Sequence, residues 1–130
     1  LMDKITFVGN ITERERLKRY YAAADLFLFP SLYDNAPLVV REAAALHTPS
    51  LMIRDSTAAE IISDSSNGFL STNNVNAYAE RITELIRQPR LITRVGDEAS
   101  RTIARSWENV AEEVYDRYMN LMIRKKLWKR

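Results

Sequence analysis

Short apolar runs alternate with segments of helical period along this chain, and that alternation limits the folds it can adopt. Four such runs occupy residues 5–8, 25–29, 50–53 and 68–70. The run at 25–29 is almost continuously apolar and stops at Pro30, which is typical of a strand covered on both faces. Strands connected through helices pair in parallel by right-handed crossovers. The chain is therefore predicted to be an α/β protein with a partial parallel sheet of about four strands flanked by helices.

Helical patterns fill the intervals between these runs. The first is predicted to start at Thr12, whose hydroxyl would form a capping box with Glu15. Further helices are predicted over residues 38–46, 58–62 and 75–86, with a break at Pro89 and two more helices after it. The last is long, begins near Ser106 and Trp107, and Trp107 is expected to anchor it in the core. Its apolar stripe comprises Val110, Val114, Tyr118, Leu121 and Met122.

Length and composition favour a single domain, residues 1–130, with 46% apolar residues and enough chain to bury a core. There is no cysteine and only one histidine, His47, so neither a disulfide framework nor a thiolate or multi-histidine metal site is expected. No apolar run approaches the roughly 20 residues that span a bilayer. These features predict a cytoplasmic location, with the inner face of the membrane as the alternative.

The formal net charge is only +2, and most of the excess lies at the C-terminal end. Its cations surround Leu127 and Trp128 and comprise Arg124, Lys125, Lys126, Lys129 and Arg130. A solvated helix end explains them most simply, since cations suit the C-terminal end of a helix dipole. A peripheral contact with an anionic membrane is the alternative. Nucleic-acid binding is not expected, because basic residues are not interleaved with a row of aromatic ones.

Two carboxylates, Asp34 and Glu42, lie eight positions apart across the junction between the second strand and the next helix. Pro37 fits the beginning of that helix, where a missing N–H costs little. The free N–H groups and the positive end of a helix dipole suit an anion such as a diphosphate. Asp34 and its neighbour Asn35 could equally be an ordinary helix entrance.

Seven blocks of sequence, in order, give this junction a context. They are 7–9, 24–31, Asp34 with Glu42, 48–49, 59–62, 67–70 and 106–107. Together they resemble the donor-binding C-terminal half of family 4 (group 1) retaining glycosyltransferases, which have two Rossmann-like domains in the GT-B arrangement. The resemblance implies a Rossmann-like sheet and a nucleotide-diphosphate sugar as donor, with no metal and no other cofactor. The implied acceptor is a cell-envelope polysaccharide, a glycolipid or a related molecule.

The resemblance also implies roles for individual residues. Glu42 takes the place of the second acid of the family's E-x7-E motif, which binds the ribose hydroxyls, and a carboxylate can accept two hydroxyl protons. Asp34 takes the place of the first acid, beside the donor hexose, as the catalytic residue. There it would either reach a different sugar hydroxyl or stabilise positive charge that develops at the anomeric carbon. The remaining donor-binding positions are Gly9, Asn10, Asn35, Ala36, Pro37, Leu38 and Val39.

The sequence departs from the family pattern at three single positions and in one short segment. Asp34 is one methylene shorter than the usual Glu, and Pro37 replaces a glycine and removes one amide donor. His47 stands where the family usually has a glycine, at a helix end that often needs a positive φ. The segment Ser56-Thr57-Ala58 replaces a frequent Gly-Gly, which is expected to alter the contacts with the donor sugar.

The resemblance further implies parts that this sequence does not contain. Family members have an N-terminal acceptor domain, and the opening units of their donor domain supply an Arg and a Lys to the diphosphate. We therefore expect residues 1–130 alone to show no transferase turnover. The strand at 5–8 is expected either to pair directly with 25–29 or to drive oligomerisation through an open edge. A catalytically silent nucleotide-binding or interaction module of the same fold is the alternative function.

Overall fold

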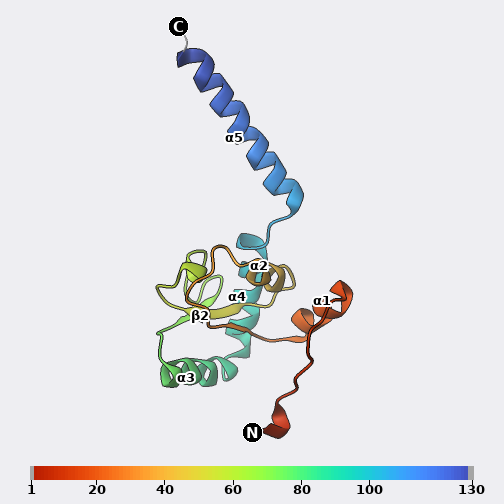
Figure 1. Cartoon of the computed structure of the whole chain (residues 1–130). Coiled ribbons are helices and arrows are strands. Elements are labelled where there is room, and N and C mark those ends of the chain that lie inside the picture. Colours follow the sequence, from red (N-terminus) through yellow and green to blue (C-terminus); the bar gives the residue numbers. More distant parts are fainter. Residues whose placement is uncertain (1, 129–130) are drawn as a thin grey trace.

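The computed structural model describes residues 2–128, which form a small α/β body and one long helix that projects from it (Figure 1). The elements in chain order are η1 (Met2–Lys4), α1 (Arg14–Ala23), β1 (Phe27–Phe29), α2 (Leu38–Ala45), β2 (Ser50–Ile53), η2 (Thr57–Ala59), β3 (Phe69–Ser71), α3 (Val75–Ile86), α4 (Pro89–Thr102) and α5 (Trp107–Trp128).

The three strands form one parallel sheet in the order β1-β2-β3. Leu28 of β1 pairs with Leu51 of β2, and Met52 of β2 pairs with Leu70 of β3. The predicted α/β class and parallel pairing are confirmed, with three strands among the described residues instead of about four. Strands of three or four residues are sufficient here because helices cover the sheet.

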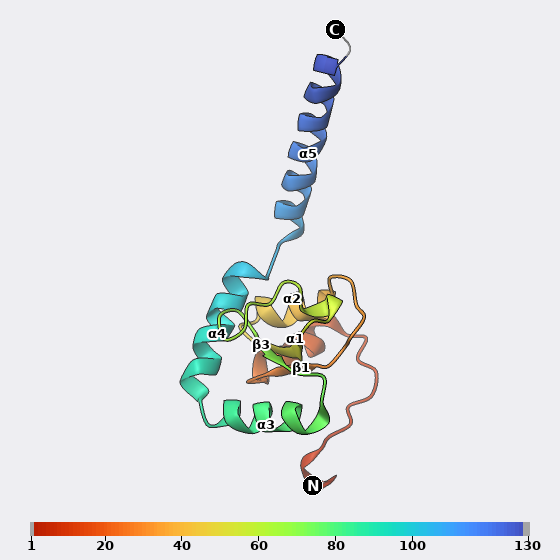
Figure 2. The same ribbon diagram turned by 90° about the vertical axis from the view of Figure 1, so that its left-hand side faces the viewer.

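Helices cover both faces of the sheet, and Figure 2 shows α2 and α3 on opposite sides of the strands. Neighbouring residues of β2 point to opposite faces. Met52 packs with α2 and the C-terminal half of α4, whereas Leu51 packs with α3 and the first half of α4. The largest buried side chain on the α3 face is Phe69, which is fully inaccessible to solvent. Residues that are consecutive in β2 thus connect two hydrophobic clusters.

The strand predicted at 5–8 does not form. The segment lies between η1 and α1 without any strand pairing (Figure 1). Its apolar side chains are exposed, Phe7 by 83%. The expected pairing with residues 25–29 is therefore wrong, whereas oligomerisation stays a prediction. The physical reason is that β-propensity counts only where a neighbouring strand accepts the backbone hydrogen bonds. No described strand lies beside this segment.

Two predicted roles of residues near helix beginnings are wrong, although α5 begins at Trp107 as expected. Helix α1 begins at Arg14 with Glu13 at its N-cap position and no side-chain cap, so the capping box is wrong. Glu15 instead binds the Lys18 ammonium at 2.7 Å, an i,i+3 pair on the helix surface. Trp107 is 75% exposed at the beginning of α5, so it does not anchor the core.

The long C-terminal helix is confirmed, and it extends away from the body in both views (Figures 1 and 2). Its predicted apolar stripe is largely exposed, since Tyr118 and Leu121 are accessible by 64% and 57%. None of the helices within residues 2–128 combines the length and the apolar composition needed to cross a bilayer. Two of the predicted basic residues, Lys129 and Arg130, lie outside the described residues.

A tight turn at the end of α2 joins three elements. His47 has φ 61°, which confirms the positive φ expected for this position. Its Nδ1 lies 2.8 Å from Asp97 Oδ1 on α4. The next residue, Thr48, is buried and donates its hydroxyl to the Tyr21 carbonyl at 2.7 Å. The turn therefore holds α2, which carries Glu42, against both α4 and the end of α1.

Candidate functional site

The loop that contains Asp34 leaves the carboxyl end of β1 and enters α2, as the sequence predicted. In open α/β sheets ligands bind outside the carboxyl ends of the strands. Pro37 is buried and occupies the N-cap position with φ −60° and ψ 119°, and Ala36 before it has φ 56°. The amides of Leu38 and Val39 belong to the first turn of α2, where N–H groups have no acceptor within the helix. This loop can present free N–H groups to an anion.

Asp34 is partly buried, and its main chain is held by another segment of the chain. Its N–H donates to Thr57 Oγ1 at 3.1 Å. Its carboxylate makes no hydrogen bond or ion pair with any residue between 2 and 128. Asn35 and Ala36, which follow it, are exposed. The carboxylate is thus fixed through its backbone and left available to a ligand.

Glu42 lies exposed on α2 and borders two hollows. One, of about 390 Å³, separates α2 from α1, and the other, of about 530 Å³, separates α2 from residues 104–110. Glu42 likewise forms no hydrogen bond or ion pair within the described part of the chain. Its charge reaches Tyr21 across the smaller hollow, because burial first and the Glu42 carboxylate second raise the pKa of the Tyr21 hydroxyl. Asp34 and Glu42 are therefore two unpaired acids held by different elements.

Several residues of these hollows were not found from the sequence. Arg14, the first residue of α1, lines both hollows together with Glu42. Its guanidinium has no ion-pair partner among the residues that the structure describes. The smaller hollow is completed by Thr12, Leu17, Lys18, Tyr21, Ala45 and Leu46. The spacing of apolar residues predicted a helix near Arg14, but it did not indicate which face of α1 would lie beside α2.

Gly9 and Asn10 lie apart from this arrangement. Both are exposed in the segment before α1, and neither lines the two hollows beside Glu42. Gly9 has φ 69°, and beyond its own atoms and those of its two chain neighbours no heavy atom lies within 4 Å of the position its Cβ would take. Their donor-binding role stays a prediction.

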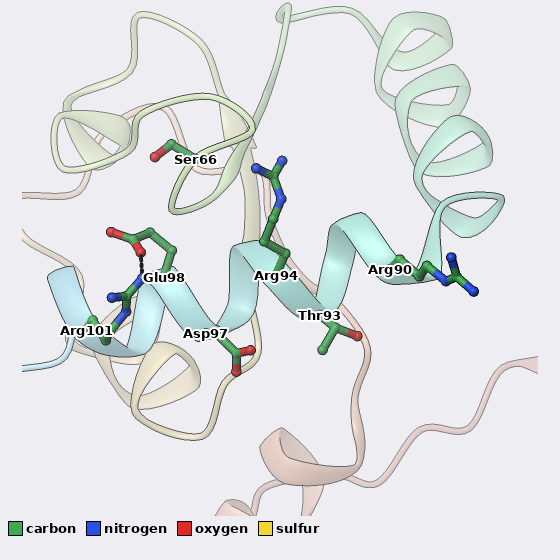
Figure 3. A pocket seen from close by; sticks show the side chains of 7 residues that line it. All are labelled: Ser66, Arg90, Thr93, Arg94, Asp97, Glu98 and Arg101. Carbon is green, nitrogen blue, oxygen red and sulfur yellow. Dashed lines mark hydrogen bonds and ion pairs between the residues drawn. The ribbon is translucent and has the colours of Figure 1, made fainter.

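A third hollow, of about 640 Å³, lies on the outer side of α4 and includes none of the predicted site residues. In Figure 3, Arg94 points toward the loop that carries Ser66, whereas Asp97 points to the other side of the helix. The acids here are paired, Glu98 with Arg101 and Asp97 with His47. The loop with Ser66 precedes β3, so this hollow is near the amino end of that strand and away from the carboxyl edge with Asp34.

Metal binding has no evident place in the described part of the chain. Between residues 2 and 128, no three histidine or acidic side chains gather as a metal site would require. Independence from a metal therefore stays a prediction about the reaction, to be tested with the donor.

Comparison with characterised sequences and structures supports the family resemblance. A family model described as glycosyl transferases group 1 matches residues 1–102. The chain is 30% identical over 109 residues to the "Putative glycosyltransferase EpsD" of Bacillus subtilis, covering 79% of this chain and 28% of that protein. It is 29% identical over 120 residues to "D-inositol 3-phosphate glycosyltransferase 2" of Catenulispora acidiphila, covering 91% and 28%. The chain thus spans about a quarter to a third of the length of these relatives.

Solved structures give the same result for the fold. The sucrose-phosphate synthase of Thermosynechococcus elongatus superposes with a TM-score of 0.80 and 28% identity, over 93% of this chain and 31% of the synthase. The C-terminal domain of a group 1 family glycosyl transferase from Francisella tularensis superposes with a TM-score of 0.65 and 22% identity, over 75% of this chain and 50% of that domain. With a family model that matches most of its length, and with β1, α2 and the unpaired acids Asp34 and Glu42 within that match, this chain belongs to the group 1 glycosyl transferases.

Proposed function

We propose that the chain is the donor-binding part of a retaining, family 4 glycosyltransferase that takes its sugar from a nucleotide-diphosphate sugar. The observation that carries this proposal is the unpaired Glu42 carboxylate beside the hollow between α1 and α2, with a second unpaired acid, Asp34, in the loop at the carboxyl end of β1. A hollow of about 390 Å³ has the size of a small-molecule site.

Within this proposal each acid recognises a different part of the donor. Glu42 accepts hydrogen bonds from the two ribose hydroxyls, and the neighbouring Arg14 adds a positive charge to the same hollow. The first-turn amides of α2 face the diphosphate. Asp34 lies beside the hexose and stabilises the positive charge that develops at the anomeric carbon as the diphosphate leaves.

The acceptor would be bound by a longer protein, of which this chain would be the C-terminal part. A polysaccharide, a glycolipid or a related molecule is the proposed acceptor class, and an N-terminal acceptor domain the proposed partner. One relative that is 30% identical over 90 residues carries the name "Alpha-galactosylglucosyldiacylglycerol synthase", which supports a lipid-linked acceptor. The proposed location is the cytoplasm, with the basic end of α5 as a contact for the inner membrane face.

Calorimetric titration of residues 1–130 with UDP, GDP, ADP and their glucose or mannose conjugates tests the proposal. Glu42→Ala removes the carboxylate that accepts hydrogen bonds from the ribose hydroxyls, and Glu42→Gln removes its charge. Each charge-assisted hydrogen bond contributes about 1.5–3 kcal/mol. We expect the preferred nucleotide to bind each variant at least about tenfold more weakly than the wild type. Glu80→Ala is the matched control, because Glu80 is an exposed glutamate on α3.

Two results would contradict the proposal. Equal affinity in the wild type and in both Glu42 variants would exclude Glu42 as the ribose ligand. Failure of the folded wild type, checked by circular dichroism, to bind any nucleotide would exclude donor binding by this chain and favour a silent interaction module of the same fold.

A further inference from the structure

One hydroxyl joins the loop that carries Asp34 to a turn more than twenty residues later. Thr57 Oγ1 accepts the Asp34 N–H at 3.1 Å and lies 3.4 Å from both the Leu32 and the Asp34 carbonyl oxygens. The Thr57 N–H donates to the Leu32 carbonyl at 3.3 Å. Since a hydroxyl has one proton, it donates to one of those two carbonyls at a time. Thr57 therefore contacts the main chain on both sides of Tyr33.

The turn that presents this hydroxyl is rigid. Ser56 is buried, and its hydroxyl donates to the Ile53 carbonyl at the end of β2 at 2.7 Å. Ala58 and Ala59 of η2 pack in the hydrophobic cluster beneath the sheet. Thr57 itself is exposed, but its neighbours on both sides are fixed by the core. A displacement of the Thr57 backbone would disturb this packing.

Apart from its bonds with Thr57, the described part of the loop that receives the hydroxyl is anchored at its two ends. It leaves β1 at Phe29 and reaches the buried Pro37 at the beginning of α2. Between these points, Tyr33 and Asn35 on the two sides of Asp34 are exposed. The hydrogen bonds of Thr57 are therefore the restraint that lies nearest to the Asp34 carboxylate.

We propose that Thr57 is a positioning residue that holds Asp34 against the donor sugar. The inference rests on the proposed function, and it adds a residue that acts on Asp34 through the backbone without touching the sugar. A hydroxyl suits this task, because it fixes the Asp34 main chain and leaves the charge of the carboxylate intact. A cation in the same place would pair with that charge.

The test compares Thr57→Val, which keeps the shape and removes the hydroxyl, with Thr57→Ser, which keeps the hydroxyl. Amide hydrogen exchange at Asp34 is measured in residues 1–130. Affinities for a nucleoside diphosphate and for its sugar conjugate are measured by calorimetry. We expect Thr57→Val to speed Asp34 exchange at least about tenfold and to reduce the affinity gained from the sugar, at unchanged nucleoside diphosphate affinity. Thr57→Ser should restore both values.

The outcomes separate this inference from the function on which it rests. Unchanged Asp34 exchange in Thr57→Val would show that Thr57 does not hold the loop. Faster exchange with an unchanged ratio of sugar-conjugate to nucleoside diphosphate affinity would show that holding the loop does not position the acid, and would also overturn the inference. A wild type that binds neither compound would overturn the proposed function together with this role in it.

Discussion

The close approach of α4 to the turn after α2 predicts that Gly96→Ala destabilises the chain. A Cβ at position 96 would lie 2.1 Å from the His47 carbonyl oxygen and 3.2 Å from Pro49 Cδ. The first of these contacts is with backbone, which cannot rotate away as a flexible side chain can. Helix and turn would have to separate by about 1 Å in an interior that is closely packed. The turn holds α2, so the change also tests how firmly Glu42 is placed.

Two opposing effects set the size of the change. Overpacking a close-packed site costs about 1–3 kcal/mol, and a contact with backbone belongs at the upper end of that range. Replacing a helical glycine by alanine returns about 1 kcal/mol. The net loss in the free energy of unfolding is therefore about 2 kcal/mol. For a chain of this size that loss lowers Tm by about 8 °C.

Urea unfolding followed by circular dichroism measures this loss directly, and a thermal scan gives the Tm. Arg94→Ala is the matched control, because Arg94 is exposed on the same helix and forms no ion pair with the described residues. We expect the control to stay within about 0.5 kcal/mol of the wild type. If Gly96→Ala proved as stable as the wild type or more stable, helix propensity would outweigh the contact, and the close packing of α4 on the turn would be refuted.

Two further changes test the body that carries the site. Burial raises the pKa of Asp64, but the Leu70 N–H, Arg54 and Arg81 outweigh it and hold that pKa below its ordinary value of 3.8. The stability this provides is complete above pH 3.8 and is lost as the pH falls toward the lower native pKa. Asp64→Asn should therefore cost about 1–2 kcal/mol in urea unfolding at pH 7 and flatten the acid limb of the stability profile, and an unchanged limb would contradict this. Phe69→Ala empties the fully buried centre of the α3 face, so we expect a loss of about 3–5 kcal/mol in the free energy of unfolding and a weakened near-ultraviolet circular dichroism signal, whereas a cooperative transition near the wild-type midpoint would refute it.

The sequence predicted the elements whose signal is local. Helix α3 begins and ends at Val75 and Ile86, as its period and Pro89 indicate, and the run at 50–53 is β2. The strand predicted for the first apolar run is wrong, because a strand depends on a neighbouring strand that the local sequence does not reveal. The predicted burial of Trp107 is wrong for a related reason, since a large aromatic residue is buried only where another element covers it. Local patterns therefore predicted helices and strands better than they predicted which other elements pack against them.

The same distinction explains the candidate site. Asp34, Pro37 and Glu42 lie within nine residues of sequence, so one strand-to-helix junction was enough to place all three near a carboxyl end. Arg14 lies near Glu42 because α1 packs beside α2, and Thr57 lies near Asp34 because η2 packs beside the loop after β1. No local pattern could therefore have assigned them.

The two acids also depend on different supports, and this determines how donor recognition can fail. Glu42 is held by α2, through the packing of that helix on the sheet and through the turn at His47. Asp34 is held by the Thr57 hydroxyl from the turn after β2. These supports share no hydrogen bond, and although η2 and α2 pack in one hydrophobic cluster, the exposed Thr57 hydroxyl takes no part in it, so its removal is expected to leave α2 unaffected. In the proposed function, loosening Thr57 therefore impairs recognition of the sugar while the nucleotide is still bound, whereas loosening α2 impairs recognition of the nucleotide.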